Sequence, residues 1–263
     1  MGCVPIFNSP LVSIITVCLN SEKYIERAIK SVLSQTYENI EYLIIDGGSK
    51  DRTLEIIKKY EGRLRYLSEP DQGIYDAMNK GISLSGGEII GILGSDDWYQ
   101  EKAVELIVKE YLKDKETGVF LGDIILVAKN GNFRRVNGTP KLIGSYQWSR
   151  INHPTCFIKK KIYQKYKYDT KFKVCSDYDL LLKLYLAGVK FHYLNEPLVY
   201  WRTGGVSSSY ITLLENYKIR KKYFGKKHKT RIFFGFLMRI IKKFFLYTVF
   251  RGKLGWLHND RQP

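Results

Sequence analysis

The sequence predicts an α/β protein with a mixed sheet, followed by an amphipathic helical tail. From about residue 10 to residue 118, short apolar runs rich in β-branched residues alternate with segments of helical period. From residue 119 the pattern changes to period two, and after residue 210 it becomes basic and amphipathic. We therefore expect a body of residues 1–210, with halves at about 10–118 and 119–210, and a tail of residues 211–263.

The first half predicts strands and helices in alternation. Strands are expected at residues 11–19, 40–45, 64–67 and 88–93. The helix after the first strand has one apolar face, made by Ile25, Ala28, Ile29, Val32 and Leu33. Asn20 or Ser21 is expected to cap this helix, and Ser49 to cap the next one, which Gly62 closes. The third helix, 75–84, is expected to break near Gly81. Such an order predicts a parallel sheet with right-handed crossovers.

The second half predicts a hairpin and a mixed arrangement of strands and helices. Asn130-Gly131 lies between two β-rich runs and is typical of a type I′ turn. A loop containing Tyr146 and Trp148 is expected at 138–150. The later elements are a strand at 156–158, a helix that Ser176 caps and Gly188 ends, two strands at 189–194 and 198–201, and a loop at 203–205.

Composition and charge narrow the function classes. At 263 residues and 44% hydrophobic, the chain is long enough to bury a full core. The net charge of +17 belongs to the tail, because 13 of the 43 basic residues and no acidic one lie between Lys218 and Lys253. The body is nearly balanced, so we expect no nucleic-acid partner. No cysteine spacing indicates zinc, and no signal peptide is evident, so we expect a cytoplasmic protein.

Polar side chains follow three of the expected parallel strands where each strand ends. Asn20 follows the first strand, Asp46 the second, and Asp96 with Asp97 the strand at 88–93. Ligands of open α/β sheets bind beyond the carboxyl ends of the strands. Two exposed carboxylates there are suited to Mg²⁺ or Mn²⁺ that arrives with substrate phosphates. The alternative is that Asp96 or Asp97 only caps the following helix. Neither a Gly-x-Gly-x-x-Gly fingerprint nor a P-loop is present.

Four segments together resemble glycosyltransferase family 2, the inverting enzymes that use nucleotide sugars. They are Pro10–Asn20, Ser31–Tyr37, Ile45–Thr53 and Gly94–Asp97. A further stretch, Glu69–Gly81, is similar to a bacterial branch that builds O-antigen, capsule and exopolysaccharide. The resemblance covers roughly residues 10–210. It implies the GT-A fold, a Rossmann-like fold of nucleotide-diphospho-sugar transferases.

The resemblance also implies roles for individual residues. The residues expected to line the nucleotide sugar are Val17, Leu19, Asn20, Asp46, Asn79, Ser95 and Asp96. Asp97 is expected to bind the metal, Mn²⁺ or Mg²⁺. The family's catalytic base belongs to an acidic pair that corresponds here to Ser176-Asp177, so Asp177 takes the base position and Asp179 is the fallback. His153, Trp201 and Arg202 are expected near the acceptor or in a covering loop.

These roles predict an inverting transfer to a glycan acceptor. The resemblance implies that this acceptor is lipid-linked, as acceptors in envelope-polysaccharide assembly often are. Asp177 would remove a proton from the acceptor hydroxyl, and burial or a neighbouring carboxylate should raise its pKa above the ordinary value of about 4. A nucleotidyltransferase is a rival, but residues 17–22 contain only Glu22 as a charge where that class needs a basic loop. A nucleic-acid-binding protein that uses the basic tail is a second rival.

The tail predicts an interfacial membrane anchor and no transmembrane span. Arg239, Lys242 and Lys243 interrupt the apolar residues of 232–250, which leaves no run of the roughly 18 uncharged residues that a span needs. On a helix these three cations share a face with Gly235, and apolar residues cover the rest. Such a basic amphipathic helix is typical of peripheral binding to anionic lipids at the inner face of a plasma membrane. The alternative is a helix that packs on the body.

Overall fold

A computed structural model describes residues 9–128, 130–138, 152–203 and 210–255, without the side chains of 242–255. By its contacts the chain divides into two compact units, Met1–Gly205 and Val206–Pro263. Each unit is described by itself below.

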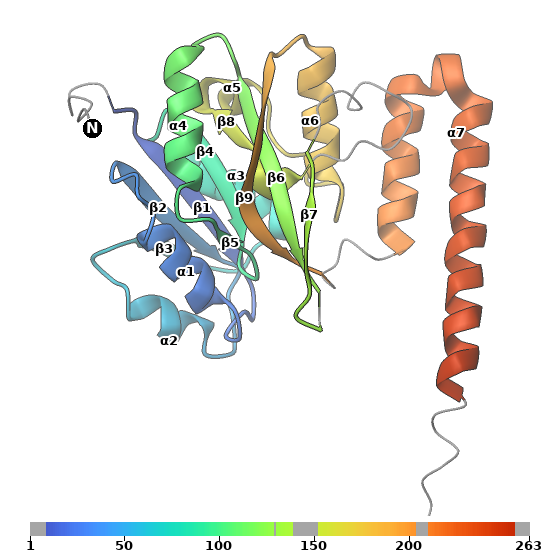
Figure 1. The fold of residues 1–263 in the computed structure, drawn as a ribbon, viewed down its shortest axis with the longest axis horizontal. Coiled ribbons are helices and arrows are strands. Elements are labelled where there is room, and N and C mark those ends of the chain that lie inside the picture. The colour runs from blue at the N-terminus through green and yellow to red at the C-terminus, as the bar shows by residue number, and fades with distance from the viewer. Residues whose placement is uncertain (1–8, 129, 139–151, 204–209, 256–263) are drawn as a thin grey trace, which may run out of the picture. The chain divides into compact units, whose positions relative to one another are not determined.

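The first unit is built on one mixed sheet, which has nine strands in the described part of the chain (Figure 1). The strands are β1 (Val12–Cys18), β2 (Ile40–Asp46), β3 (Arg65–Ser68), β4 (Ile89–Gly94), β5 (Trp98–Tyr99), β6 (Val119–Val127), β7 (Phe133–Val136), β8 (Phe157–Lys159) and β9 (Phe191–Arg202). Their order is β3-β2-β1-β4-β8-β6-β9-β5, and β7 pairs with β6. The first four are mutually parallel, as predicted. Strand β8 is antiparallel to both β4 and β6, and it joins the two halves into one sheet.

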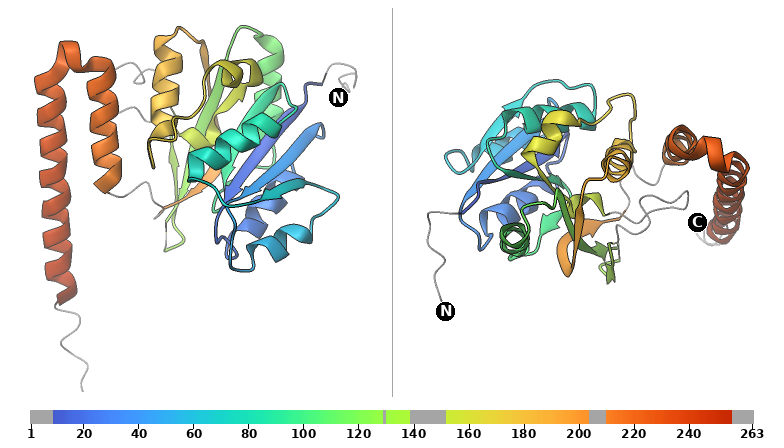
Figure 2. Two further views of the ribbon diagram at one scale, coloured as in Figure 1. Left: turned by 180° about the vertical axis from the view of Figure 1, so that it is seen from behind. Right: turned by 90° about the horizontal axis from the view of Figure 1, so that it is seen from above.

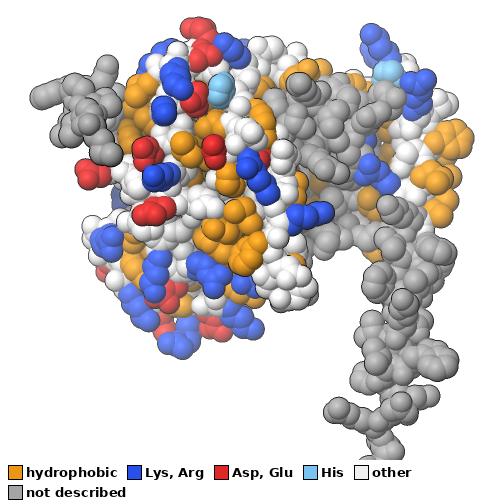
Figure 3. Space-filling view, viewed as in Figure 1, with side chains coloured by type: hydrophobic (Ala, Val, Ile, Leu, Met, Phe, Trp, Pro, Cys, Tyr) orange, Lys and Arg blue, Asp and Glu red, His pale blue; other side chains and the backbone are white. Residues whose placement is uncertain are grey.

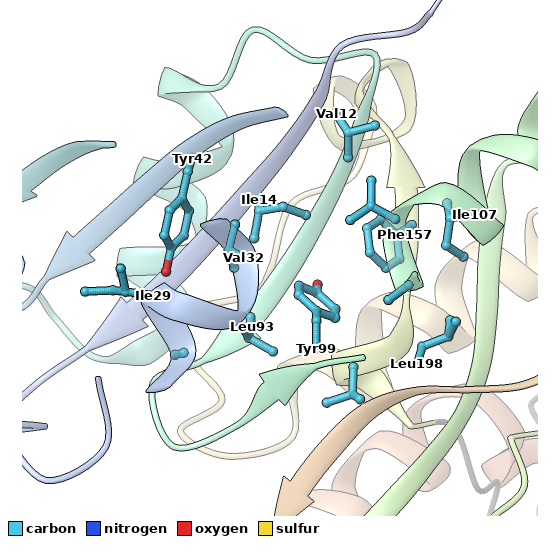
Figure 4. Close-up of a cluster of buried hydrophobic side chains, with 14 of the residues drawn as sticks. Val12, Ile14, Ile29, Val32, Tyr42, Leu93, Tyr99, Ile107, Phe157 and Leu198 are labelled. Carbon is cyan, nitrogen blue, oxygen red and sulfur yellow. The ribbon is translucent and has the colours of Figure 1, made fainter. Parts of the chain in front are cut away.

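Helices cover both faces of this sheet (Figure 2). They are α1 (Ile25–Leu33), α2 (Thr53–Lys58), α3 (Ile74–Leu84), α4 (Ala103–Lys113), α5 (Lys160–Lys165) and α6 (Ser176–Leu186). Helices α1, α2 and α4 pack on one face, where Ile14, Leu93 and Phe157 of the sheet meet Ile29 and Ile107 (Figure 4). Helices α3, α5 and α6 contribute to the core on the other face. Burial of large apolar side chains on both faces explains why the strands of the first half read as continuous apolar runs.

The predicted helix caps were wrong. Helix α1 begins at Ile25, α2 at Thr53 and α6 at Ser176, and none has a side-chain cap. Asn20 and Ser49 instead bond to each other's loops: the Asn20 N–H donates to Ser49 Oγ, and Asn20 Oδ1 accepts from the Lys50 N–H. Asn20 and Ser49, two of the side chains predicted as caps, therefore connect two loops at the carboxyl ends of the strands.

Two further predictions about regular structure were wrong. Helix α3 continues through Gly81. A Cβ at this position would lie 2.5 Å from Ile15 Cγ2, so the glycine allows α3 to lie directly on β1. The two strands expected at 189–194 and 198–201 form the single strand β9. A register shift opposite Asp123 accommodates Pro197, which has no N–H to donate to the ladder.

The sequence did not predict β5 or α5. The hairpin was predicted, since β6 and β7 pair antiparallel and Gly131 has a φ of 82° in their connection. Tyr146, Trp148 and the glycines at 204–205 lie outside the described residues.

The second unit is the helix α7 (Tyr210–Gly255), which is interrupted at His228, where φ is −132° and ψ is 24°. Its two limbs run side by side, and the rings of Tyr217 and Phe236 lie 4.6 Å apart (Figure 1). No helix in the described residues is long and apolar enough to cross a membrane. Hydrophobic and basic side chains adjoin on the described part of this unit (Figure 3).

One detail of the predicted tail differs. Arg239 is half-buried, and burial together with nearby Arg220 lowers the pKa of Arg239 to about 10. Its guanidinium therefore does not belong to a fully solvated basic face. Among the side chains of the second limb that the structure describes, several exposed ones are large and apolar: Phe233, Phe234, Leu237, Met238 and Ile241.

Candidate active site

Asp46 organises the carboxyl ends of β1 and β2. Its side chain is completely buried, and its oxygens accept hydrogen bonds from the Ser49 N–H, the Ser49 hydroxyl and, at 2.6 Å, the Ser68 hydroxyl. The parallel register sets Cys18 directly beside Asp46. The carboxylate therefore fixes the loop after β2 against β1 and β3.

The end of β1 supplies an open rim next to this loop. Val17 is buried, whereas Leu19 and Asn20 are exposed. Asn20 has a φ of 50°, a left-handed conformation that Asn tolerates better than most residues. The Ser21 hydroxyl lies 2.8 Å from that of Ser95, and this contact links the β1 loop to the segment after β4. Four of the predicted nucleotide-sugar residues thus gather at one edge of the sheet.

Asp96 and Asp97 follow β4 in a turn closed by the hydrogen bond from the Asp97 N–H to the Gly94 carbonyl. They do not cap α4, which begins at Ala103. Oδ2 of Asp97 and Oδ1 of Asp96 lie 3.0 and 3.3 Å from the point where a Gly94 Cβ would stand. The two carboxylates therefore converge on the space that this glycine leaves open.

The expectation that Asp97 is exposed was wrong, because its side chain is only 4% accessible. Burial, and then the neighbouring charge of Asp96, raise the pKa of Asp97 well above its usual range. Burial likewise raises the pKa of Asp96. Two carboxylates held together in this way repel each other, and a cation offsets that repulsion.

The residues present fit a divalent cation that arrives with its substrate. Among the described residues, no three His, Cys, Asp or Glu side chains form a group that could hold a metal ion by themselves. Mg²⁺ commonly binds through one or two carboxylates together with substrate phosphates, and Asp96 and Asp97 match that pattern.

Arg202, the last residue of β9, lies against the carboxylates. Its N–H donates to Oδ1 of Asp97 at 3.0 Å, and its guanidinium lies 4.2 Å from the ring centroid of Tyr24. The charge of Arg202 lowers the pKa of both Asp96 and Asp97, although burial outweighs it. Trp201 is half-buried and packs against the core on one face of the sheet.

Asp177 lies in the first turn of α6, whose amino-terminal end faces the same edge of the sheet. Strands β6 and β9 run parallel to β4, and α6 returns the chain to the start of β9, so the helix must begin near the carboxyl ends of the strands. Oδ1 of Asp177 accepts hydrogen bonds from the Tyr75 hydroxyl at 3.1 Å and the Tyr178 N–H at 2.8 Å. Asp179 is 1% accessible, and its Oδ2 lies 3.6 Å from the Lys183 ammonium.

His153 and Asn79 both contact Tyr168. His153 Nε2 lies 2.7 Å from the Tyr168 hydroxyl, and burial lowers the pKa of His153. Both ends of the Asn79 amide bind the backbone of Tyr168: Oδ1 accepts from its N–H at 3.1 Å, and Nδ2 donates to its carbonyl at 3.0 Å. Asn79 therefore connects α3 to the segment before α6.

Sequence reasoning missed Tyr75 and Tyr168. Tyr75 belongs to Glu69–Gly81, the stretch that resembles the polysaccharide-building branch, but no motif predicted a role for it. Its partner Asp177 is 102 residues away, so only the fold brings the two together. Tyr168 carried no sequence signal.

Comparison with known proteins identifies the family of the chain. The model of the family described as "Glycosyl transferase family 2" matches residues 13–178. The chain is 36% identical over 202 residues to a chondroitin synthase of Pasteurella multocida and, equally, to a hyaluronan synthase of that organism. The match covers 71% of this chain and 20% of each relative. The chain thus spans about a fifth of the length of these curated relatives.

Solved structures share the fold. TarS of S. aureus in complex with UDP-GlcNAc has a TM-score of 0.64 and 21% identity, over 79% of this chain and 64% of that one. The mannosyltransferase PcManGT of Pyrobaculum calidifontis, in complex with GDP-Man and Mn²⁺, has a TM-score of 0.62 and 16% identity, over 82% and 64%. These likenesses confirm the predicted GT-A fold. The match of the family model to more than half of the sequence establishes that the chain belongs to glycosyl transferase family 2.

Proposed function

We propose that this chain is an inverting glycosyltransferase, which moves a sugar from a nucleotide-diphosphate sugar to a hydroxyl of a glycan acceptor. The observation that carries the proposal is the convergence of Asp96 and Asp97 at the end of β4. The buried carboxylate of Asp97 and the half-buried one of Asp96, both with raised pKa values, are suited to a cation and diphosphate. The UDP-GlcNAc and GDP-Man bound in two proteins of similar fold favour N-acetylhexosaminyl or hexosyl transfer.

In this proposal the nucleotide lies along the rim formed by Val17, Leu19, Asn20 and Ser95. Asp46, which is completely buried, is proposed to act at the base by shaping the loop beneath it through its bonds to Ser49 and Ser68. Asp97, with Asp96 beside it, would hold Mn²⁺ or Mg²⁺. When bound, such an ion acts as a Lewis acid that stabilises the diphosphate leaving group.

Asp177 is the proposed general base. Its carboxylate accepts the proton of the acceptor hydroxyl while the hydroxyl oxygen attacks the anomeric carbon. The bond between that carbon and the diphosphate oxygen breaks, and its electron pair leaves with the nucleotide. Attack on the face opposite the leaving group inverts the anomeric configuration. His153 and Arg202 are proposed to lie on the acceptor side, and Asp179 is the alternative base.

The acceptor is proposed to be a lipid-linked glycan of envelope polysaccharide assembly, such as O-antigen or capsule. The support is the second unit, where exposed Phe234 and Met238 adjoin basic residues. This combination suits an anionic membrane surface and gives the enzyme a peripheral place on the inner face of the plasma membrane.

A panel of nucleotide sugars, assayed with Mn²⁺ for transfer or for hydrolysis of the donor, tests the proposal. One donor should be consumed in a metal-dependent reaction, and Asp177→Asn should reduce turnover by about 10²–10⁴-fold while retaining donor binding. A matched Asp179→Asn variant shows whether the fallback carboxylate is the base. Wild-type turnover in Asp177→Asn would remove Asp177 from the mechanism.

A further inference from the structure

Asp177 presents its two carboxylate oxygens to different surroundings. Oδ1 accepts both the Tyr75 hydroxyl and the Tyr178 N–H. Among the described residues, none donates a hydrogen bond to Oδ2. One oxygen is therefore used to hold the carboxylate in place, and the other is left for a substrate proton.

Tyr75 is suited to be a permanent donor to this carboxylate. Its side chain is 5% accessible, and burial, followed by the charge of Asp177, raises the pKa of Tyr75 well above its usual range. The phenol therefore keeps its proton throughout the neutral range. A hydrogen bond from a neutral donor to a carboxylate is stronger than a bond between two neutral groups.

The surrounding residues hold Tyr75 in this position. Its ring stacks on that of Tyr168, with 5.5 Å between centroids and 25° between planes. Asn79 lies one helical turn after Tyr75 on the same face of α3 and binds the Tyr168 backbone at both N–H and carbonyl. The Tyr168 hydroxyl, in turn, contacts His153 Nε2 and the Tyr163 hydroxyl. The stack on Tyr75 is thus fixed by hydrogen bonds on its far side.

We propose that Tyr75 is a positioning residue for Asp177, which binds Oδ1 through its hydroxyl and directs Oδ2 toward the acceptor hydroxyl. The inference rests on the proposed role of Asp177 as the base. It gives the segment Glu69–Gly81 a function on the acceptor side of the reaction: Tyr75 orients the carboxylate, and Asn79 fixes the ring that supports Tyr75.

Other groups also act on the Asp177 carboxylate. The carboxylate interacts electrostatically with Tyr75 of α3, His153, Cys156 and Tyr168. Asp179 and Lys183 lie on its own helix. Tyr75 differs from His153, Cys156 and Tyr168 because its hydroxyl also donates a hydrogen bond to the Asp177 carboxylate. Removal of this hydroxyl should therefore destabilise the ionised form of Asp177 specifically.

Tyr75→Phe tests the proposal in the full chain, because it removes one hydroxyl and keeps the stacked ring. We expect kcat to fall by roughly 10- to 100-fold, as for the loss of a hydrogen bond to a charged group. The acidic limb of the pH dependence of kcat should move to higher pH, and calorimetric affinity for the donor with Mn²⁺ should stay unchanged. Tyr42→Phe is the matched control, since it removes a similarly buried hydroxyl that contacts Thr16 in the core on the other face of the sheet.

The outcomes separate this inference from the proposed function. If Asp177→Asn is inactive while Tyr75→Phe keeps the wild-type kcat and pH profile, Tyr75 does not position the base. A lower kcat with an unmoved acidic limb, or an equal loss in Tyr42→Phe, assigns Tyr75 a structural role and also overturns the inference. Turnover retained in Asp177→Asn overturns the proposed base itself. If Tyr75→Phe fails to fold, Asn79→Ala replaces it, and an unmoved acidic limb in that variant overturns the inference.

Discussion

The backbone N–H of Arg202 donates a 3.0 Å hydrogen bond to Oδ1 of Asp97, across 105 residues of sequence. Asp97 follows β4, the last of the four parallel strands of the first half, and Arg202 ends β9, the last strand of the second half. The proposed metal ligand is therefore held by a residue of the opposite half, and its position depends on the folding of both.

Asp97→Asn should abolish the Mn²⁺-dependent part of donor binding. The amide keeps an oxygen for the Arg202 N–H but removes one negative charge from the pair with Asp96. Because that relieves repulsion between the buried Asp97 and the half-buried Asp96, the metal-free variant should be at least as stable as the wild type. Calorimetric titration with donor and Mn²⁺ measures the first effect, and thermal unfolding without metal measures the second. Unchanged donor affinity with Mn²⁺ would exclude Asp97 as a metal ligand.

The stability of the protein should decrease as the pH falls below about 6.5, the ordinary pKa of histidine, and His153 should contribute to this slope. Burial lowers the pKa of His153 in the folded protein, so the unfolded chain binds a proton at a pH where the folded chain does not. The free energy of unfolding therefore falls through the window from about 6.5 down to the lowered pKa.

Urea unfolding between pH 7 and pH 5.5 measures this slope in the wild type and in His153→Gln, which should show a shallower one. His192→Gln controls for the loss of one imidazole elsewhere in the chain, because His192 is half-buried and faces Glu110. Equal slopes in the wild type and His153→Gln would show that His153 does not titrate in this range.

Gly81→Ala should destabilise the protein by about 1–3 kcal/mol, the typical cost of an overpacked core. The new Cβ would stand 2.5 Å from Ile15 Cγ2, and Ile15 is fully buried. Gly86→Ala is the matched control, since its Cβ would meet nothing closer than 3.6 Å. Denaturant unfolding compares the two variants, and equal stabilities would mean that α3 can move away from β1 at little cost.

The full chain should sediment with anionic vesicles at low salt and should not sediment with neutral ones. Phe234→Ser with Met238→Ser should weaken this binding, because both side chains are more than 60% accessible on the apolar side of the second limb. Lys221→Gln with Lys222→Gln should weaken it through the loss of about 1 kcal/mol per cation near the surface. A wild-type chain that stays in the supernatant with anionic vesicles would exclude the proposed anchor.

The sequence could predict the elements of the site that depend on local pattern. Asn20, Asp46, Asp96 and Asp97 each follow an apolar run, and parallel strands bring their carboxyl ends to one edge. The sequence could not predict the contacts of Tyr75 with Asp177 or of Arg202 with Asp97, because each joins residues more than 100 positions apart.

The prediction of the helix caps was wrong for a related reason. Asn20 and Ser49 are good capping residues in isolation, but the fold brings their two loops together, and each finds a partner in the other. Strand β5 has only two residues, too few for any periodicity, and exists because Trp98 and Tyr99 meet β9. Local preference therefore predicted the elements, and tertiary contacts decided their ends.

Strand β8 has a consequence for how the body can be divided. It has three residues, yet its two edges carry the hydrogen bonds that connect β4 to β6. A fragment that ends before β8 would leave β4 as an unprotected edge strand, open to pairing with other copies. The halves are thus poor modules for exchange between related enzymes, and a chimera made by joining halves at about residue 118 should aggregate unless β8 is matched to the β4 it must pair with.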